Sequence, residues 1–223
     1  MTRVLSALAL ASLLATPSAA QQLHRDGLND PAQRSYATTS PHISSDSDRL
    51  ETHIASCLIL SNLKEQELSK FVKEKIDDDD VEKFAKKMEK QHKKFVSELK
   101  EFAPEAATAK LSDDDDDGDD SKSSRYTATT GDNVDRKLIT LQRRAAEKCL
   151  KMVKEEMKDK DDDELAKAYV GQQISAHIGM LAQLEAAERS ASGNLKSVIK
   201  DVKSKTEDHL DEAKDLMKDL KDN

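Results

Sequence analysis

Residues 81–99 read VEKFAKKMEKQHKKFVSEL. Apolar side chains recur in this stretch every three or four residues, with lysines and glutamates between them, and this spacing predicts an amphipathic α-helix. The apolar stripe consists of Val81, Phe84, Ala85, Met88, Phe95, Val96 and Leu99. His92 stands seven residues after Ala85 and seven before Leu99, so this titratable side chain lies on the face that the helix buries.

Four other segments carry the same helical period, at 47–76, 133–157, 164–190 and 194–220. Aspartates at 77–80 and 161–163 precede two of the helices, where carboxylates cap free N–H groups and suit the helix dipole. Short connections favour antiparallel neighbours. The pattern predicts an all-α protein, an antiparallel four-helix bundle in which 133–157 is one accessory helix.

The remaining segments divide the chain. Residues 1–20 predict a secretory signal peptide, because Arg3 precedes an apolar run and Ser18-Ala19-Ala20 ends it with small residues. Residues 21–46 lack apolar periodicity and predict a disordered tail, and 104–132 predict a disordered acidic linker within a bundle domain that spans 47–222. No segment reaches the roughly 20 apolar residues of a membrane span. We therefore expect an exported protein, periplasmic or extracellular.

Composition excludes some functions. The net charge is −8 and aromatic residues are 3% of the chain, which argues against nucleic acid as a partner and against β-sandwiches. Two cysteines, Cys57 and Cys149, permit one disulfide or two separate thiols. The aspartate run from Asp113 matches the start of a calcium loop, but Ser124 stands where the bidentate glutamate is required, which argues against calcium.

Four titratable side chains fall on apolar stripes of four different helical segments. Glu65, His92, His177 and His209 each have apolar residues seven positions before and after them. If the helices bring them to one height, a carboxylate and three imidazoles meet inside the bundle, a set that suits copper, zinc or iron. The alternative is a structural polar network in which the glutamate accepts hydrogen bonds from histidine.

Di-iron carboxylate bundles need a Glu-x-x-His element on two helices, since positions three apart project together. This chain has one, from Glu89 to His92, which makes Glu89 a further candidate ligand. Ile174 and Thr206 stand three residues before the other two histidines. The sequence therefore favours a mononuclear site over a di-iron oxidase.

Four short segments resemble a known family. They are LKEQELSKF at 63–71, VEKFAKKMEKQH at 81–92, YVGQQISAH at 169–177 and TEDHLDEA at 206–213. The chain resembles the exported bacterial family called domain of unknown function 4142. The resemblance implies a ferritin-like four-helix bundle with a signal peptide. It also implies that Glu65 or Glu67, His92, His177 and His209 are its characteristic polar positions, and it implies no reaction.

No catalytic motif accompanies these residues: Gly-x-Ser-x-Gly, a glycine-rich phosphate loop and His-Glu-x-x-His are all missing. We expect a noncatalytic or weakly catalytic protein that binds a transition metal in an envelope or stress-related role. The competing hypothesis is a structural module that binds another envelope protein and holds no metal.

Overall fold

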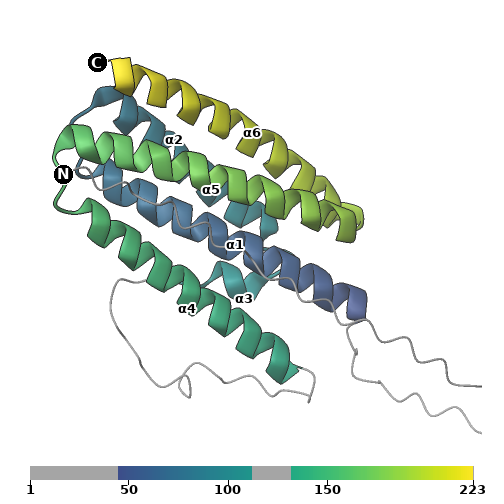
Figure 1. Cartoon of the computed structure of the whole chain (residues 1–223). Coiled ribbons are helices and arrows are strands. Elements are labelled where there is room, and N and C mark those ends of the chain that lie inside the picture. The colour runs from purple at the N-terminus through teal and green to yellow at the C-terminus, as the bar shows by residue number, and fades with distance from the viewer. Residues whose placement is uncertain (1–44, 112–131, 223) are drawn as a thin grey trace, which may run out of the picture. The chain divides into compact units, whose positions relative to one another are not determined.

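The computed structural model describes residues 45–111 and 132–222, and within them it contains six helices and no strand. The helices are α1 (Asp46–Lys73), α2 (Asp79–Leu99), α3 (Pro104–Ala107), α4 (Asp132–Met157), α5 (Asp162–Ser190) and α6 (Gly193–Asp222) (Figure 1). The prediction of an all-α protein is confirmed, and the five long helices lie within a few residues of the segments expected from the apolar period.

Side chains that accept hydrogen bonds from free backbone N–H groups begin three of the long helices. Ser45 and Asp48 form a reciprocal capping box at the start of α1. The carboxylate of Asp78 accepts from two amides at the start of α2, and that of Asp161 accepts from the Glu164 amide in α5. The two aspartate runs therefore begin helices, as their composition predicts.

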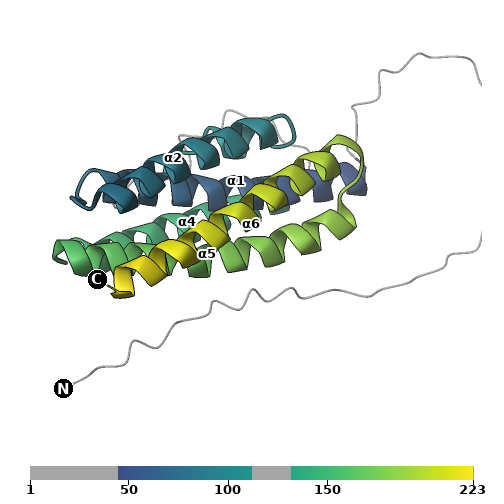
Figure 2. The ribbon, with the colours of Figure 1, turned by 90° about the horizontal axis from the view of Figure 1, so that it is seen from above.

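Two helical hairpins form the centre of the bundle. α1 packs mainly on α2, and α5 packs mainly on α6, while fewer contacts join α1 to α5 and α2 to α6. Figure 2 shows the α1–α2 hairpin on one side and the α5–α6 hairpin on the other. Gly193 begins α6 with a positive φ of 47°, a conformation that residues with a Cβ adopt only with strain. This glycine lets the chain reverse directly into the last helix.

The accessory helix α4 lies beside α1 and runs in the same direction. Arg49 pairs with Asp135 near the start of both helices, at 2.8 Å, and Cys57 lies 3.4 Å from the Gln142 amide oxygen two turns further along. Cys149 follows Gln142 by seven residues, which is about 10 Å along a helix. This register explains why both cysteines are free thiols.

The buried apolar side chains form two clusters. One contains Val72, Phe84 and Met88, and the other contains Phe95 and Leu184. All five are at most 2% exposed, and burying a side chain of this size stabilises the fold by roughly 1.5–3 kcal/mol. Buried polar residues contributed by α1, α2, α5 and α6 accompany the two clusters. The candidate site is built from these polar residues.

The segment predicted as an acidic linker begins with ordered structure. Residues 104–107 form α3, and Ala106 and Leu111 are buried against the bundle. The linker prediction overlooked these apolar side chains because the acidic run that follows dominates the composition. The residues predicted as a signal peptide and as a tail, up to residue 44, and the aspartate run at 113–120 lie outside the described residues.

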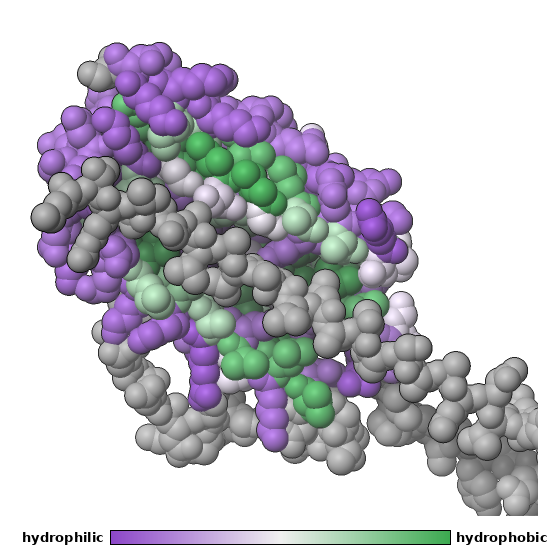
Figure 3. Space-filling view, viewed as in Figure 1, coloured by the Kyte–Doolittle hydropathy of each residue, from purple (hydrophilic) through white to green (hydrophobic). Residues whose placement is uncertain are grey.

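Exposed apolar residues gather mainly on α4. Val134, Leu138 and Leu141 are 39–67% exposed, although the apolar period suggests that the helix buries Leu138 and Leu141. Figure 3 shows hydrophobic groups on this face of the molecule amid predominantly hydrophilic helices. None of the described helices combines the length and the hydropathy needed to cross a membrane.

Candidate metal centre

Three buried histidines from three helices meet inside the bundle. The ring centroids of His92 on α2, His177 on α5 and His209 on α6 form a nearly equilateral triangle with sides of 5.4, 5.6 and 5.4 Å. One ring nitrogen from each lies within 4.8 Å of the others. Each side chain is at most 1% exposed. The spacing of the apolar stripes predicts that these residues face inward, and the helix packing brings them to one height.

The His92 ring is oriented by an amide on α1. Its Nδ1 lies 2.7 Å from the Asn62 Oδ1, and the Asn62 Nδ2 donates to the Leu58 carbonyl at 2.7 Å. Because the amide nitrogen is committed to that carbonyl, the amide oxygen faces the ring and only accepts. His92 must therefore donate from Nδ1, which leaves a lone pair on its Nε2.

The His177 ring is oriented by the backbone of its own helix. Its Nδ1 lies 2.7 Å from the Gln173 carbonyl oxygen, one turn earlier in α5. A carbonyl oxygen can only accept, so this nitrogen donates and the Nε2 carries a lone pair. In metalloproteins, a hydrogen bond of this kind from the outer ring nitrogen fixes the tautomer that binds the ion.

Four ring nitrogens of the cluster have no hydrogen-bond partner among the described residues. These are the Nε2 of His92, the Nε2 of His177 and both ring nitrogens of His209. A buried polar atom without a partner costs about 1–3 kcal/mol, so a cluster of such atoms requires a physical explanation. Nitrogens that carry lone pairs and lie close together are suited to share one cation.

Burial keeps all three imidazoles neutral. It lowers the pKa of His92 well below the usual value, and nearby His177 and His209 lower it further. Burial likewise lowers the pKa of His177, and it lowers that of His209 to about 3. Neutral imidazole is the form that binds metals, so at neutral pH none of the three must first lose a proton.

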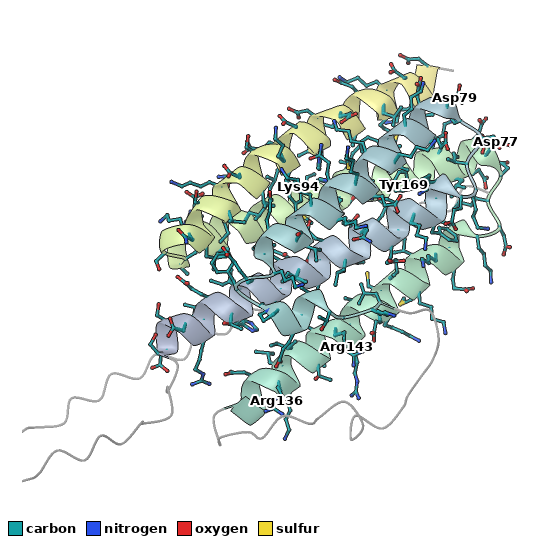
Figure 4. All side chains as sticks on the ribbon, turned by 180° about the vertical axis from the view of Figure 1, so that it is seen from behind. Asp77, Asp79, Lys94, Arg136, Arg143 and Tyr169 are labelled. Carbon is teal, nitrogen blue, oxygen red and sulfur yellow. The ribbon has the colours of Figure 1, made fainter. Side chains whose placement is uncertain are left out.

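The fourth central helix, α1, contributes a buried carboxylate. Glu65 is 1% exposed, accepts from the Gln173 side-chain amide at 2.9 Å and lies 3.3 Å from the Lys64 ammonium. One turn further along, Tyr169, which lies within the bundle in Figure 4, donates to the Ser69 hydroxyl at 2.9 Å. These two hydrogen bonds join α1 to α5 beside the histidines. The negative charge of Glu65 also raises the pKa of His177 and so opposes the effect of burial.

The structure does not bring every candidate ligand to the histidine cluster. Among the described residues, Glu65, Glu67 and Glu89 are not members of the group whose ligand atoms lie within 4.8 Å of one another. Glu89 is half-buried and pairs with Lys73 at 2.5 Å, and Glu67 is partly exposed. Glu89 and His92 are three residues apart, but the Glu89 carboxylate engages a lysine of α1.

Sequence reasoning missed two residues that orient the site. Asn62 and Gln173 are both fully buried. The Asn62 side-chain oxygen accepts from the His92 Nδ1. The Gln173 backbone carbonyl accepts from the His177 Nδ1, whereas the Gln173 side chain donates to Glu65. Asn62 stands three residues before Glu65 and Gln173 stands four before His177, so both lie on faces that carry a candidate ligand. A search for amide side chains on the faces that carry candidate ligands would have found both residues, although the carbonyl that orients His177 belongs to the backbone.

The fold and the site define a helical-bundle protein with a buried cluster of three histidines. The chain belongs to the family described as Domain of unknown function (DUF4142), whose model matches residues 35–168. The matched residues include His92 and end before His177. None of the curated proteins or solved structures compared with the chain matches it.

Proposed function

We propose that this protein is an exported, ferritin-like four-helix bundle that binds one transition-metal ion through His92, His177 and His209. The observation that carries the proposal is the convergence of ring nitrogens that have no hydrogen-bond partner in the part of the chain that the structure describes. Export rests on residues 1–20, which resemble a signal peptide. For an exported protein, we place the metal-related role in the cell envelope or in its response to stress.

The geometry is close to that of a three-histidine site. Zinc–nitrogen bonds of about 2.0–2.1 Å and tetrahedral angles place ligand nitrogens about 3.3 Å apart. The three nitrogens lie within 4.8 Å of one another, so each ring has to move inward by roughly 1 Å at most to bind an ion. Side-chain rotation and small helix shifts supply movements of this size without a change of fold.

The ligand chemistry defines the class of ion. Imidazole suits zinc, copper, iron and nickel, whereas magnesium and calcium prefer carboxylate and carbonyl oxygens. The cluster offers neutral nitrogens, and Glu65, the buried carboxylate of the described core, is engaged by Lys64 and Gln173. We therefore place the ion among the transition metals, with a fourth coordination position that no histidine of the cluster occupies.

Metal analysis of the purified protein tests the proposal. After dialysis against zinc, ferrous or cuprous ions and removal of loosely bound metal, we expect one ion per chain by mass spectrometry of the digested sample. His92→Ala, His177→Ala and His209→Ala each remove this ion. His53→Ala is the matched control, because His53 is a partly exposed histidine of α1 that stands outside the cluster.

A second measurement uses the unaltered protein, so that loss of folding in a variant does not decide the outcome. On addition of zinc, the nitrogen NMR signals of the three cluster histidines should shift while that of His53 stays in place. The proposal is refuted if the folded protein retains no ion and if none of the three metals shifts the NMR signals of the cluster histidines. It would support the competing hypothesis, in which the histidines belong to the polar core of a structural module.

A further inference from the structure

A buried thioether lies next to the histidine cluster. Met180 on α5 is 4% exposed and stands three residues after His177. Its sulfur lies 3.8 Å from the hydroxyl of Thr206, which stands three residues before His209 on α6. Residues three apart in an α-helix share a face, so the sulfur lies between the two helices that supply two of the three histidines, within one turn of them.

The length of the side chain lets the sulfur reach the cluster. Met180 and His177 stand about 4.5 Å apart along the helix, and the flexible, unbranched methionine side chain covers a distance of this size. The Thr206 hydroxyl donates its single hydrogen to the Val202 carbonyl at 2.8 Å. Because this shorter contact uses the hydrogen, the lone pairs of the sulfur remain free for a ligand.

The charge of the surroundings favours a monovalent ion. The three imidazoles and the thioether are neutral, and Glu65, the buried carboxylate of the described core, is offset by the Lys64 ammonium. The cost of burying an ion in a medium of low dielectric constant rises with the square of its charge, so a divalent ion without compensating anions costs about four times as much as a monovalent one. A soft thioether next to nitrogen ligands also selects Cu(I) among the metals that imidazole binds.

We propose that the ion held by the three histidines is cuprous copper and that the Met180 sulfur is its fourth ligand. This inference rests on the proposed function and names the metal of that same site. A flexible methionine beside the three rings would complete a four-coordinate site without admitting water.

Competition titrations test the metal and the ligand separately. Under anaerobic, reducing conditions, a chromogenic Cu(I) chelator measures the cuprous affinity, and a fluorescent chelator measures the zinc affinity. We expect the wild-type protein to bind Cu(I) more tightly than Zn(II). Met180→Leu, which conserves volume, should lower the Cu(I) affinity at least about tenfold, or 1.4 kcal/mol, and leave the Zn(II) affinity unchanged.

Met88→Leu is the matched control. Met88 is fully buried in α2, four residues before His92, and packs in the apolar cluster that contains Val72 and Phe84, whereas Met180 packs in the other cluster. This variant should keep both affinities. X-ray absorption of the wild-type Cu(I) complex should show nitrogen and sulfur neighbours, and Met180→Leu should remove the sulfur.

The outcomes separate this inference from the proposed function. A Cu(I) complex with nitrogen neighbours alone, or a Met180→Leu variant with wild-type Cu(I) affinity, overturns the role of the thioether. A site that binds zinc more tightly than Cu(I) overturns the identity of the metal while the three-histidine site stands. A protein that binds neither ion overturns both proposals.

Discussion

In the metal-free protein, folding stability should fall as the pH decreases below the ordinary pKa of histidine. Burial lowers the pKa of His92, His177 and His209, that of His209 to about 3. The unfolded chain takes up a proton on each imidazole near pH 6.5, whereas the folded chain keeps them neutral. Protonation therefore favours the unfolded state, and the stability present above pH 6.5 is lost as the pH falls toward the folded-state values.

The magnitude follows from the number of buried rings. Between pH 7.5 and pH 5.5, an imidazole that stays neutral in the folded state and has an unfolded pKa of 6.5 contributes about 1.4 kcal/mol of destabilisation. Three such rings give at most about 4 kcal/mol, a large fraction of the roughly 5–15 kcal/mol that stabilises a typical domain. Few other side chains titrate in this interval, because free carboxylates protonate below it.

Urea unfolding in the presence of a metal chelator, followed by circular dichroism at several pH values, measures this loss. His209→Ala should remove about a third of the change between pH 7.5 and pH 5.5, whatever its effect on absolute stability. His53→Ala, which alters a histidine outside the cluster, should retain nearly all of it. Two results would refute neutral imidazoles in the folded protein. One is a free energy of unfolding that is the same at pH 7.5 and pH 5.5, and the other is a full change with pH that persists in His209→Ala.

Three further outcomes are expected. Asn62→Leu removes the acceptor that orients His92 and should weaken zinc binding about 10–100-fold in a chelator competition, whereas Glu89→Gln, which alters a half-buried pair outside the cluster, should leave it unchanged. Leu184→Ala opens a cavity in the core and should cost about 2–5 kcal/mol in urea unfolding, against at most about 0.5 kcal/mol for the exposed Leu141→Ala. Thiol titration of the denatured, unreduced protein should find both cysteines free, and a disulfide would contradict the parallel register of α1 and α4.

The helices could be predicted from the sequence because one period determines them. Apolar residues at helical spacing fix which face of each helix is buried, and aspartates mark where α2 and α5 begin. Leu138 and Leu141 show the limit of this argument. Their spacing is that of a buried stripe, but α4 contacts the rest of the bundle mainly through α1 and leaves them exposed. How many neighbours a helix has is a tertiary property that its own period does not encode.

The candidate site was predictable in part for the same reason. The seven-residue offsets place His92, His177 and His209 on buried faces, and the packing of α2, α5 and α6 brings them together. The positions of the glutamate carboxylates were not predictable in this way, because a long glutamate side chain can turn toward a lysine of a neighbouring helix. Glu89 pairs with Lys73 of α1, and the spacing of apolar residues does not indicate which partner a glutamate takes.

The location of the histidines relates metal binding to the stability of the whole bundle. His92 belongs to the α1–α2 hairpin, while His177 and His209 belong to the α5–α6 hairpin, and contacts within each hairpin exceed those between them. An ion held by all three rings therefore bonds the two hairpins together at the interface with fewer contacts. A ligand that binds only the folded state stabilises it by mass action, so loading the site should oppose separation of the hairpins. If the proposed function holds, the unpartnered imidazoles destabilise the metal-free core and the bound ion stabilises the loaded one, so the stability of the bundle depends on the metal.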